Sequence, residues 1–180
     1  MCKKGGSDLE QEELTEWFDK YGQAILTFIL LMVRDYQQAE DLTQETFIKA
    51  FRNQHQFERK SSVKTWLYSI AHNVTKDHFR KKHPLRHYLG LTMREADDKP
   101  IPEQIVTMNV QNEQLYKSIQ QLKPSYRQVI ILRKLKEFST TETALILNWS
   151  ESKVKMTLKR ALVELKNQLI KGGVTNDLFR

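Results

Sequence analysis

The sequence has few of the residues and segments that mark secreted or membrane-spanning proteins. Cys2 is its single cysteine, so the chain cannot form an intramolecular disulfide, and a reducing compartment is expected. The longest apolar run, "AILTFILLMV" at residues 24–33, is too short to cross a bilayer. No apolar segment directly follows the lysines near the amino terminus, so no signal peptide is expected. We therefore expect a cytoplasmic protein without direct membrane insertion.

Residue patterns for catalysis and for metal binding are also missing. The five histidines show no ligand-like spacing with one another or with Cys2, so we expect no metal site. There is no glycine-rich phosphate loop, and no nucleophile stands beside a recognisable base. The sequence therefore predicts a protein that is not an enzyme and needs no cofactor.

What the sequence has is positive charge, gathered in two blocks. The net charge is +7. Residues 59–83 carry seven cations against one carboxylate, and residues 109–171 carry twelve against five, whereas residues 1–58 are net acidic. Two separate basic blocks favour two phosphate-contacting surfaces. Solvated lysine faces that only keep the protein soluble would give the same charge, so charge alone leaves both interpretations open.

Apolar residues recur at helical spacing along most of the chain, which predicts an all-α fold. Prolines at 84, 100 and 102 interrupt this pattern in the middle. We expect two small helical domains, with a flexible linker at residues 84–108 and a tail at 172–180. The domains are predicted at residues 1–83 and 109–171. The predicted helices lie at about residues 9–20, 22–33, 36–52, 62–82, 110–122, 125–138, 140–147 and 151–170.

The carboxyl-terminal block has the pattern of a helix-turn-helix. Ser139 and Glu142 form a capping box that begins a short helix, and Ser150 caps a long final helix after the turn "NWS". Ala144 is small where the first helix must approach the second, and Asn148 tolerates the left-handed backbone of a turn. In this motif the outward face of the second helix lies in the major groove of DNA.

Two faces of that final helix can be predicted from its spacing. The buried stripe is predicted to hold Val154, Leu158, Ala161, Leu162 and Leu165. The outward face is predicted to carry Ser152, Lys153, Met156, Lys159 and Arg160. The helix at residues 66–82 divides in the same way: Leu67, Ile70, Ala71 and Val74 form its apolar stripe, opposite Ser69, His72, Asn73, Lys76 and Arg80. His72 lies at the edge of that polar face, and the pattern leaves open whether it contacts DNA or is ordinary surface.

Three blocks in order resemble a known family. They are "DYQQAEDLTQETFIKAF", "FERKSSVKTWLYSIAHNVTKDHFRKK" and "LKPSYRQVIILRKLKEFSTTETALILNWSESKVKMTLKRALVEL". Together they resemble a bacterial RNA polymerase sigma factor of the sigma-70 superfamily, in its extracytoplasmic-function class. The resemblance implies a four-helix first domain, a helix-turn-helix second domain, and promoter-specific initiation of transcription. It implies core RNA polymerase and promoter DNA as partners, and a membrane-anchored anti-sigma factor as inhibitor.

The resemblance also implies which residues meet these partners. Core polymerase contains the beta-prime and beta subunits. Its beta-prime clamp helices would bind Asp41, Leu42, Gln44 and Glu45. The melted minus-10 element would meet Phe57, Lys60, Ser61, Ser62, Lys64, Trp66, Asn73, Lys76, Arg80, Lys81 and Lys82. The minus-35 duplex would meet Ser152, Lys153, Lys155, Met156, Lys159 and Arg160. Lys153, Met156 and Thr157 depart from the family pattern, which leaves the minus-35 sequence open.

Two other kinds of protein would explain part of the sequence. A stand-alone helix-turn-helix regulator with an amino-terminal sensing or dimerisation domain would explain residues 139–170 but not the "DLTQE" block. A membrane-surface or RNA-binding adaptor would explain the charge but not the order of the motifs. Binding to core polymerase would separate the sigma-factor hypothesis from both.

Overall fold

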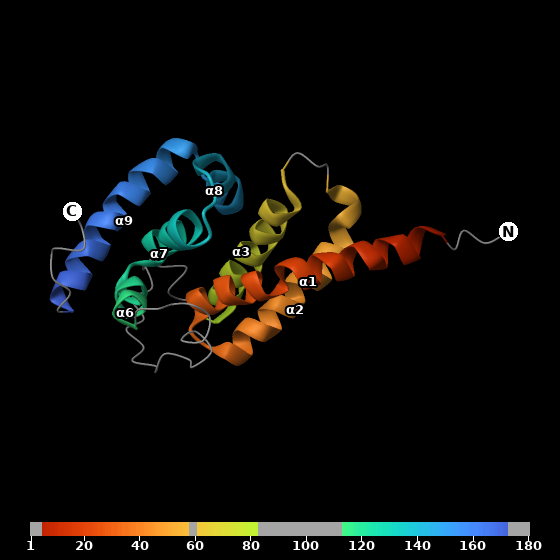
Figure 1. The fold of residues 1–180 in the computed structure, drawn as a ribbon, viewed down its shortest axis with the longest axis horizontal. Helices are drawn as coiled ribbons and strands as arrows, with labels where there is room; N and C mark the ends of the chain where they lie inside the picture. Colours follow the sequence, from red (N-terminus) through yellow and green to blue (C-terminus); the bar gives the residue numbers. More distant parts are fainter. Residues whose placement is uncertain (1–4, 58–60, 83–112, 173–180) are drawn as a thin grey trace.

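The amino-terminal half of the chain folds into three long helices (Figure 1). The structure, a computed structural model, describes residues 5–57, 61–82 and 113–172. Helix α1 runs from Gly5 to Val33, α2 from Tyr36 to Asn53, and α3 from Val63 to Lys82. A short 3-10 helix, η1, continues α2 at Gln54–Gln56. We call the assembly of α1, α2 and α3 the amino-terminal unit.

The carboxyl-terminal half is built from shorter helices that end in one long one. Helix α6 spans Glu113–Gln121, α7 spans Pro124–Ile130, and a π-helical segment, η2, spans Ile131–Leu135. Helix α8 spans Thr140–Leu147 and α9 spans Glu151–Lys171. We call α6 to α9 the carboxyl-terminal unit. Since the described residues contain helices and no strand, the all-α prediction is confirmed.

The predicted break between residues 20 and 22 is wrong, because α1 is one continuous helix of 29 residues. Gly22 was expected to begin a second helix, but it lies buried inside α1. A Cβ at Gly22 would lie 3.6 Å from the ring of Phe18, which is ordinary contact. One glycine weakens a helix by about 1 kcal/mol, and burial of the neighbouring apolar residues outweighs that cost. The four helices expected in the first domain are therefore three.

A second difference concerns residues 125–138, which were expected to form one helix. Pro124 begins α7 at the first helical turn, where its missing N–H is tolerated. From Ile131 the chain widens into a π-helix, and the N–H of Lys136 donates to the carbonyl of Ile131 at 2.9 Å. Ile131 and Leu132 both stay buried in this segment. The wider turn ends the helix three residues earlier than the periodicity predicts.

Each unit has an apolar interior. The amino-terminal core includes Ile25, Phe28, Ile29, Leu67 and Val74, and the carboxyl-terminal core includes Ile119, Val129, Ile130, Ile146 and Leu165. The predicted linker at residues 84–108 and the tail at 172–180 lie outside the described residues, apart from Gly172, which follows the end of α9.

The two units pack directly against each other, which the sequence did not predict. Helix α3 lies beside α8, and the carboxyl end of α1 meets α7 (Figure 1). The Oγ1 of Thr65 on α3 donates to Oε1 of Glu142 on α8 at 3.2 Å. The ring of Tyr68 on α3 meets that of Phe138, edge to face, at 4.7 Å. We call this set of contacts the interdomain contact.

Candidate nucleic-acid and protein interfaces

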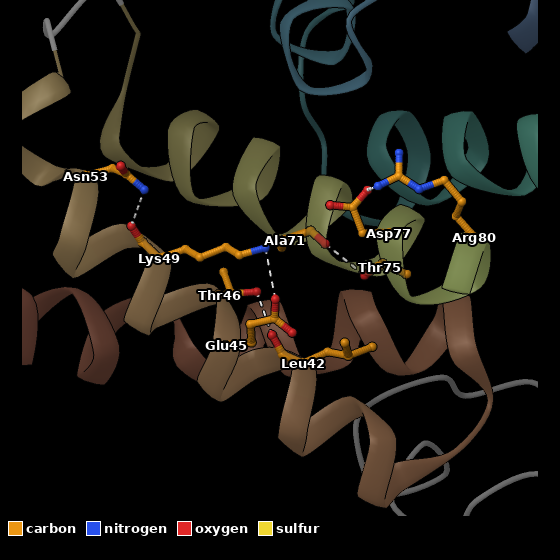
Figure 2. Close-up of polar contacts among 9 residues, drawn as sticks. All are labelled: Leu42, Glu45, Thr46, Lys49, Asn53, Ala71, Thr75, Asp77 and Arg80. Carbon is orange, nitrogen blue, oxygen red and sulfur yellow. Dashed lines mark hydrogen bonds and ion pairs between the residues drawn. The ribbon is translucent and has the colours of Figure 1, made fainter. Parts of the chain in front are cut away.

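Helix α2 presents a polar face at the motif "DLTQE". Asp41 and Gln44 are exposed, while Glu45 is half-buried and forms an ion pair with Lys49 one turn later at 2.9 Å (Figure 2). Leu42, one residue from Asp41, is buried. The structure therefore brings Asp41, Gln44 and Glu45 together on the surface, whereas Leu42 holds α2 on the core.

The same face of α2 continues into two apolar side chains that sequence reasoning missed. Ile48 is 51% exposed and Phe51 is 39% exposed. They follow Asp41 by seven and ten residues, so all three lie on one side of the helix. That spacing was visible in the sequence, but both residues also fit an amphipathic core stripe. A face with carboxylates at one end and exposed apolar groups at the other suits a protein partner.

Three aromatic rings meet where α2 ends and α3 begins. The ring centroids of Phe57 and Trp66 are 5.0 Å apart, and that of Trp17 on α1 lies 5.8 Å from Trp66 and 6.3 Å from Phe57. Trp17 is buried, while Phe57 and Trp66 remain partly exposed. Partly exposed rings can stack on unpaired bases, and the buried Trp17, which the sequence analysis did not identify, fixes their positions.

The first turn of α3 is held by polar side chains. Ser62 caps the helix, because its hydroxyl accepts a hydrogen bond from the N–H of Thr65 at 3.1 Å. Lys64 extends over the ring of Phe138, with its Nζ 4.6 Å from the centroid. Ser61 is partly exposed, and Lys60 lies outside the described residues. Lys64, which is predicted to meet minus-10 DNA, therefore also contacts the carboxyl-terminal unit.

Further along α3, polar and basic side chains form an exposed row. Asn73, Lys76 and Arg80 are exposed and follow one another at three- and four-residue intervals on one side of α3. Arg80 pairs with Asp77 at 3.1 Å (Figure 2), an exposed pair that is worth little in free energy and that a phosphate can replace. Lys81 is also exposed, and the side chain of Lys82 lies outside the described residues.

The sequence left open whether His72 contacts DNA or is ordinary surface. Neither alternative is correct, because His72 lies inside the molecule. It is 7% exposed, on the side of α3 that faces α7, and it lies beside Gln128. Burial, together with the nearby cation of Lys76, lowers the pKa of His72 to about 4. The imidazole is therefore neutral at physiological pH. Helical periodicity within the first domain could not reveal this, because the residue that faces His72 belongs to the second.

The helix-turn-helix has the predicted geometry. The hydroxyl of Ser139 accepts from the N–H of Glu142, and the carboxylate of Glu142 accepts from the N–H of Ser139, which completes the capping box. These hydrogen bonds lower the pKa of Glu142. Asn148 is left-handed, with φ 53°, and Ser150 accepts from the N–H of Lys153. The turn between α8 and α9 is thus fixed by residues that the sequence identified.

The outward face of α9 is solvent-exposed along its first three turns. This face carries Ser152, Lys153, Lys155, Met156, Lys159 and Arg160, all exposed. Lys153 lies over the ring of Trp149, with its Nζ 4.2 Å from the centroid. Four cations and a 56% exposed Met156 can meet phosphates, guanine edges and thymine methyl groups. The prediction that Leu162 belongs to the buried stripe is wrong, since this residue is 39% exposed.

Two absences hold for the described residues. No group of three or more histidine, cysteine, aspartate or glutamate side chains is arranged to hold a metal ion there. Among the helices that the structure describes, none combines the length and the apolar character required to span a bilayer.

Two family models match the chain, one on each unit. Residues 17–84 match the model "Sigma-70 region 2", and residues 112–165 match "Sigma-70, region 4". The first match covers the α2 face, the aromatic cluster and α3, and the second covers the helix-turn-helix. Every surface described above therefore lies within one of the two matches.

Curated relatives are similar over most of the chain. The ECF RNA polymerase sigma factor SigX of Bacillus subtilis (strain 168) is 38% identical over 157 residues, which cover 84% of this chain and 81% of SigX. The RNA polymerase sigma factor YlaC of the same organism is 36% identical over 166 residues, which cover 89% of this chain and 94% of YlaC.

Solved structures are similar to both units together. The sigma factor RpoE from Bartonella quintana, solved in complex with the anti-sigma factor NepR, matches with a TM-score of 0.71 and 25% identity. That match covers 88% of this chain and 97% of RpoE. CnrH, solved with the cytosolic domain of CnrY, matches in fold with a TM-score of 0.64 at 20% identity, over 89% of this chain and 90% of CnrH.

Proposed function

This chain belongs to the sigma-70 family of RNA polymerase sigma factors, in its extracytoplasmic-function class, and we therefore propose that its exposed surfaces have separate roles in the initiation of transcription. The observation that carries the proposal is that two exposed basic faces, on α3 and α9, lie one in each family match. A stand-alone helix-turn-helix regulator would leave residues 17–84 without a role.

Residues 1–83 bind core polymerase and open the promoter. The α2 face from Asp41 to Phe51 meets the basic, donor-rich surface of the polymerase, because it offers carboxylates, an amide and exposed apolar groups. Phe57 and Trp66 hold unstacked bases of the minus-10 element, and Asn73 contacts a base nearby. The exposed cations of α3 follow the backbone of the melted strand.

Residues 109–171 recognise the minus-35 element as duplex, and residues 84–108 link the two activities. Lys153 and Arg160 donate to base edges, while Lys155 and Lys159 lie close enough on the same face to contact phosphates. No step requires catalysis by this chain, since the catalytic centre belongs to the polymerase. The protein acts in the cytoplasm, where bacterial RNA polymerase works.

An anti-sigma factor controls the chain in this proposal. Support comes from the Bartonella relative, whose matched structure was solved with the anti-sigma factor NepR and covers most of this chain. The inhibitor is proposed to be membrane-anchored, in line with the family resemblance alone. Co-purification of this chain with a membrane fraction of its host, released by detergent, would support the anchoring.

Reconstitution with core polymerase tests the function. Purified chain is expected to bind core polymerase in a pull-down and to give discrete run-off transcripts from genomic fragments, which report the promoter sequence at the same time. If the chain instead fails to bind core polymerase and binds a palindromic duplex tightly as a dimer, the proposal is wrong.

A further inference from the structure

The indole of Trp149 forms a fixed platform in the turn between α8 and α9. The left-handed Asn148 ends α8, and the N–H of Trp149 donates to the carbonyl of Ala144 at 3.0 Å. The N–H of Asn148 donates to the carbonyl of Leu145 at 3.3 Å, which completes the two hydrogen bonds of a Schellman motif. The ring itself is half-buried and packs against the apolar core. The backbone and the side chain of Trp149 are therefore both held in place.

The ammonium of Lys153 lies on this platform. Its Nζ is 4.2 Å from the centroid of the Trp149 ring, which is within the range of a cation–π contact. Ser150, between the two residues, accepts from the N–H of Lys153 at 3.3 Å. The carboxylate of Glu151, two residues before Lys153, accepts from the hydroxyl of Thr141 at 2.9 Å. Both ends of the lysine are therefore fixed, its backbone by Ser150 and its ammonium by the ring.

This placement of Lys153 brings no advantage to α9 itself. A cation in the first turn of a helix opposes the helix dipole, whose positive end lies there. Lysine also loses more rotamer freedom than most side chains when its ammonium is held. The cap at Ser150 uses only the backbone N–H, so it does not require a lysine at position 153. Since the side chain is exposed, we expect its ordered ammonium to bind something outside the protein.

An ammonium that is fixed at the start of α9 suits a base edge better than a phosphate. In a helix-turn-helix the first residues of the second helix contact base edges in the major groove. A freely moving lysine can swing out to a phosphate, whereas the ring of Trp149 holds Lys153 back over the turn.

The chemistry of an ammonium selects among the four bases, because this group only donates hydrogen bonds. In the major groove guanine offers two adjacent acceptors, N7 and O6. Adenine places a donor beside its acceptor, thymine offers one acceptor beside a methyl group, and cytosine offers a donor. A fixed ammonium therefore favours guanine.

We propose that Trp149 is a positioning residue that holds Lys153 as the reader of one guanine in the minus-35 element. The inference rests on the proposed function and deepens it, since it names a base at a site whose sequence the family resemblance leaves open. Lys155 and Lys159 lie on the same outward face and contact phosphates in the proposed function. Lys153 is the cation of this face for which the described residues show a ring contact.

Duplexes that lack a single acceptor test the base. 7-Deazaguanine lacks N7 but keeps Watson–Crick pairing, and it is placed in turn at each guanine of the minus-35 element, in promoters found by run-off transcription. Holoenzyme reconstituted from core polymerase and the full chain is expected to lose affinity about fivefold at one guanine and to be little affected at the others. A minus-35 element without guanine, an equal loss at every guanine, or no loss at any of them overturns the inference.

Replacements of Trp149 test the platform. Trp149→Phe keeps a ring face and should keep the preference for guanine over 7-deazaguanine at that position. Trp149→Leu keeps an apolar side chain on the core without a ring, and should lower this preference about two- to fivefold, which corresponds to one exposed cation–π contact. Fluorinated tryptophans at position 149 change the size of the ring little but weaken its negative face, so the preference should fall as fluorines are added. A preference that fluorination leaves unchanged overturns the role of Trp149, whether or not Trp149→Leu folds.

Two lysine variants of the same face separate base reading from phosphate binding. Lys153→Ala should abolish the preference for guanine over 7-deazaguanine. Lys155→Ala, the matched control, should weaken binding by the same factor on both duplexes and reduce the salt slope by about one. If Lys153→Ala behaves like Lys155→Ala, Lys153 contacts a phosphate and the inference is wrong.

The outcomes also distinguish this inference from the proposed function. If the chain does not bind core polymerase or gives no run-off transcripts, the proposed function fails and the inference fails with it. If transcripts depend on the minus-35 element but no guanine in it responds to the loss of N7, the proposed function stands and the inference alone is wrong.

Discussion

His72 lies where the two units meet, and its surroundings make stability depend on pH. Its pKa is lowered from 6.5 to about 4, so between these values the unfolded chain takes up a proton that the folded chain excludes. Protonation therefore favours unfolding as the pH falls. Between pH 7 and pH 5 this residue should cost about 2 kcal/mol of unfolding free energy. Urea unfolding at the two pH values measures the loss.

A neutral replacement isolates the contribution of His72. His72→Gln keeps a polar side chain that cannot titrate, so its unfolding free energy should change less between pH 7 and pH 5 than that of the wild type. His55→Gln changes an exposed histidine on η1 and should keep the wild-type dependence. Identical pH dependence in the wild type and His72→Gln would show that His72 is solvated rather than buried.

At the scale of single helices, α9 predicts a loss of sequence recognition. Lys153→Ala and Arg160→Ala each remove an exposed cation from the outward face, with no buried partner left behind. Each should weaken initiation that depends on minus-35 by about 1 to 3 kcal/mol per lost base contact. Run-off transcription on promoters with intact and with scrambled minus-35 sequence measures this. An equal loss on both promoters would assign these side chains to phosphates instead.

Helix α2 predicts a loss of polymerase binding without a loss of fold. Asp41→Lys with Gln44→Ala reverses the charge of an exposed face, and Ile48→Ser removes an exposed apolar group from the same face. Both changes should reduce the affinity for core polymerase in a titration and leave the unfolding free energy within about 0.5 kcal/mol of the wild type. Glu12→Lys, an exposed change on α1 outside this face, is the control. Wild-type affinity in both variants would remove this face from the interface.

Local signals in the sequence predicted some elements and not others. The capping box of α8, the left-handed Asn148 and the cap at Ser150 each depend on residues within four positions, and all three were predicted correctly. The predicted break between residues 20 and 22 was wrong, because burial along α1 outweighs the helix-weakening effect of Gly22. The predicted burial of Leu162 was wrong, because apolar residues at helical spacing indicate which side of a helix is buried but not where the neighbouring helix ends.

At the scale of the whole molecule, the interdomain contact predicts cooperative unfolding. Two units that bury side chains against each other should unfold in one calorimetric transition. Arg34→Ala with Gln120→Ala should divide it into two transitions, because each unit then unfolds with its own stability. Lys134→Ala with Gln121→Ala should keep one transition. A single transition in the first variant, unchanged in midpoint, would mean that these hydrogen bonds do not couple the units.

The arrangement of the two units lay beyond sequence reasoning. The helices of each unit could largely be predicted from periodicity and charge, and the family resemblance supplied the faces that we propose bind DNA. Contacts such as those of Arg34 with Gln120 join residues 86 positions apart and follow no repeating pattern. The polar residues buried there, such as Thr65 and His72, have the spacing of an exposed face, so their burial depends entirely on the other unit. Prediction from the sequence of one unit alone therefore assigns them to the surface.

The carboxyl end of α1 is capped by residues that are synthesised much later than the helix itself. Gln120 and Arg127 are made 89 and 95 residues after the carbonyls of Leu31 and Met32 that they cap. At about 5 to 20 residues per second, roughly 5 to 20 s pass before these donors exist. Until then those carbonyls must accept hydrogen bonds from water, and the amino-terminal unit has no carboxyl-terminal unit to pack against. A chain released before that point would carry the α2 face that we propose binds polymerase, but not the α9 face that we propose binds the minus-35 element.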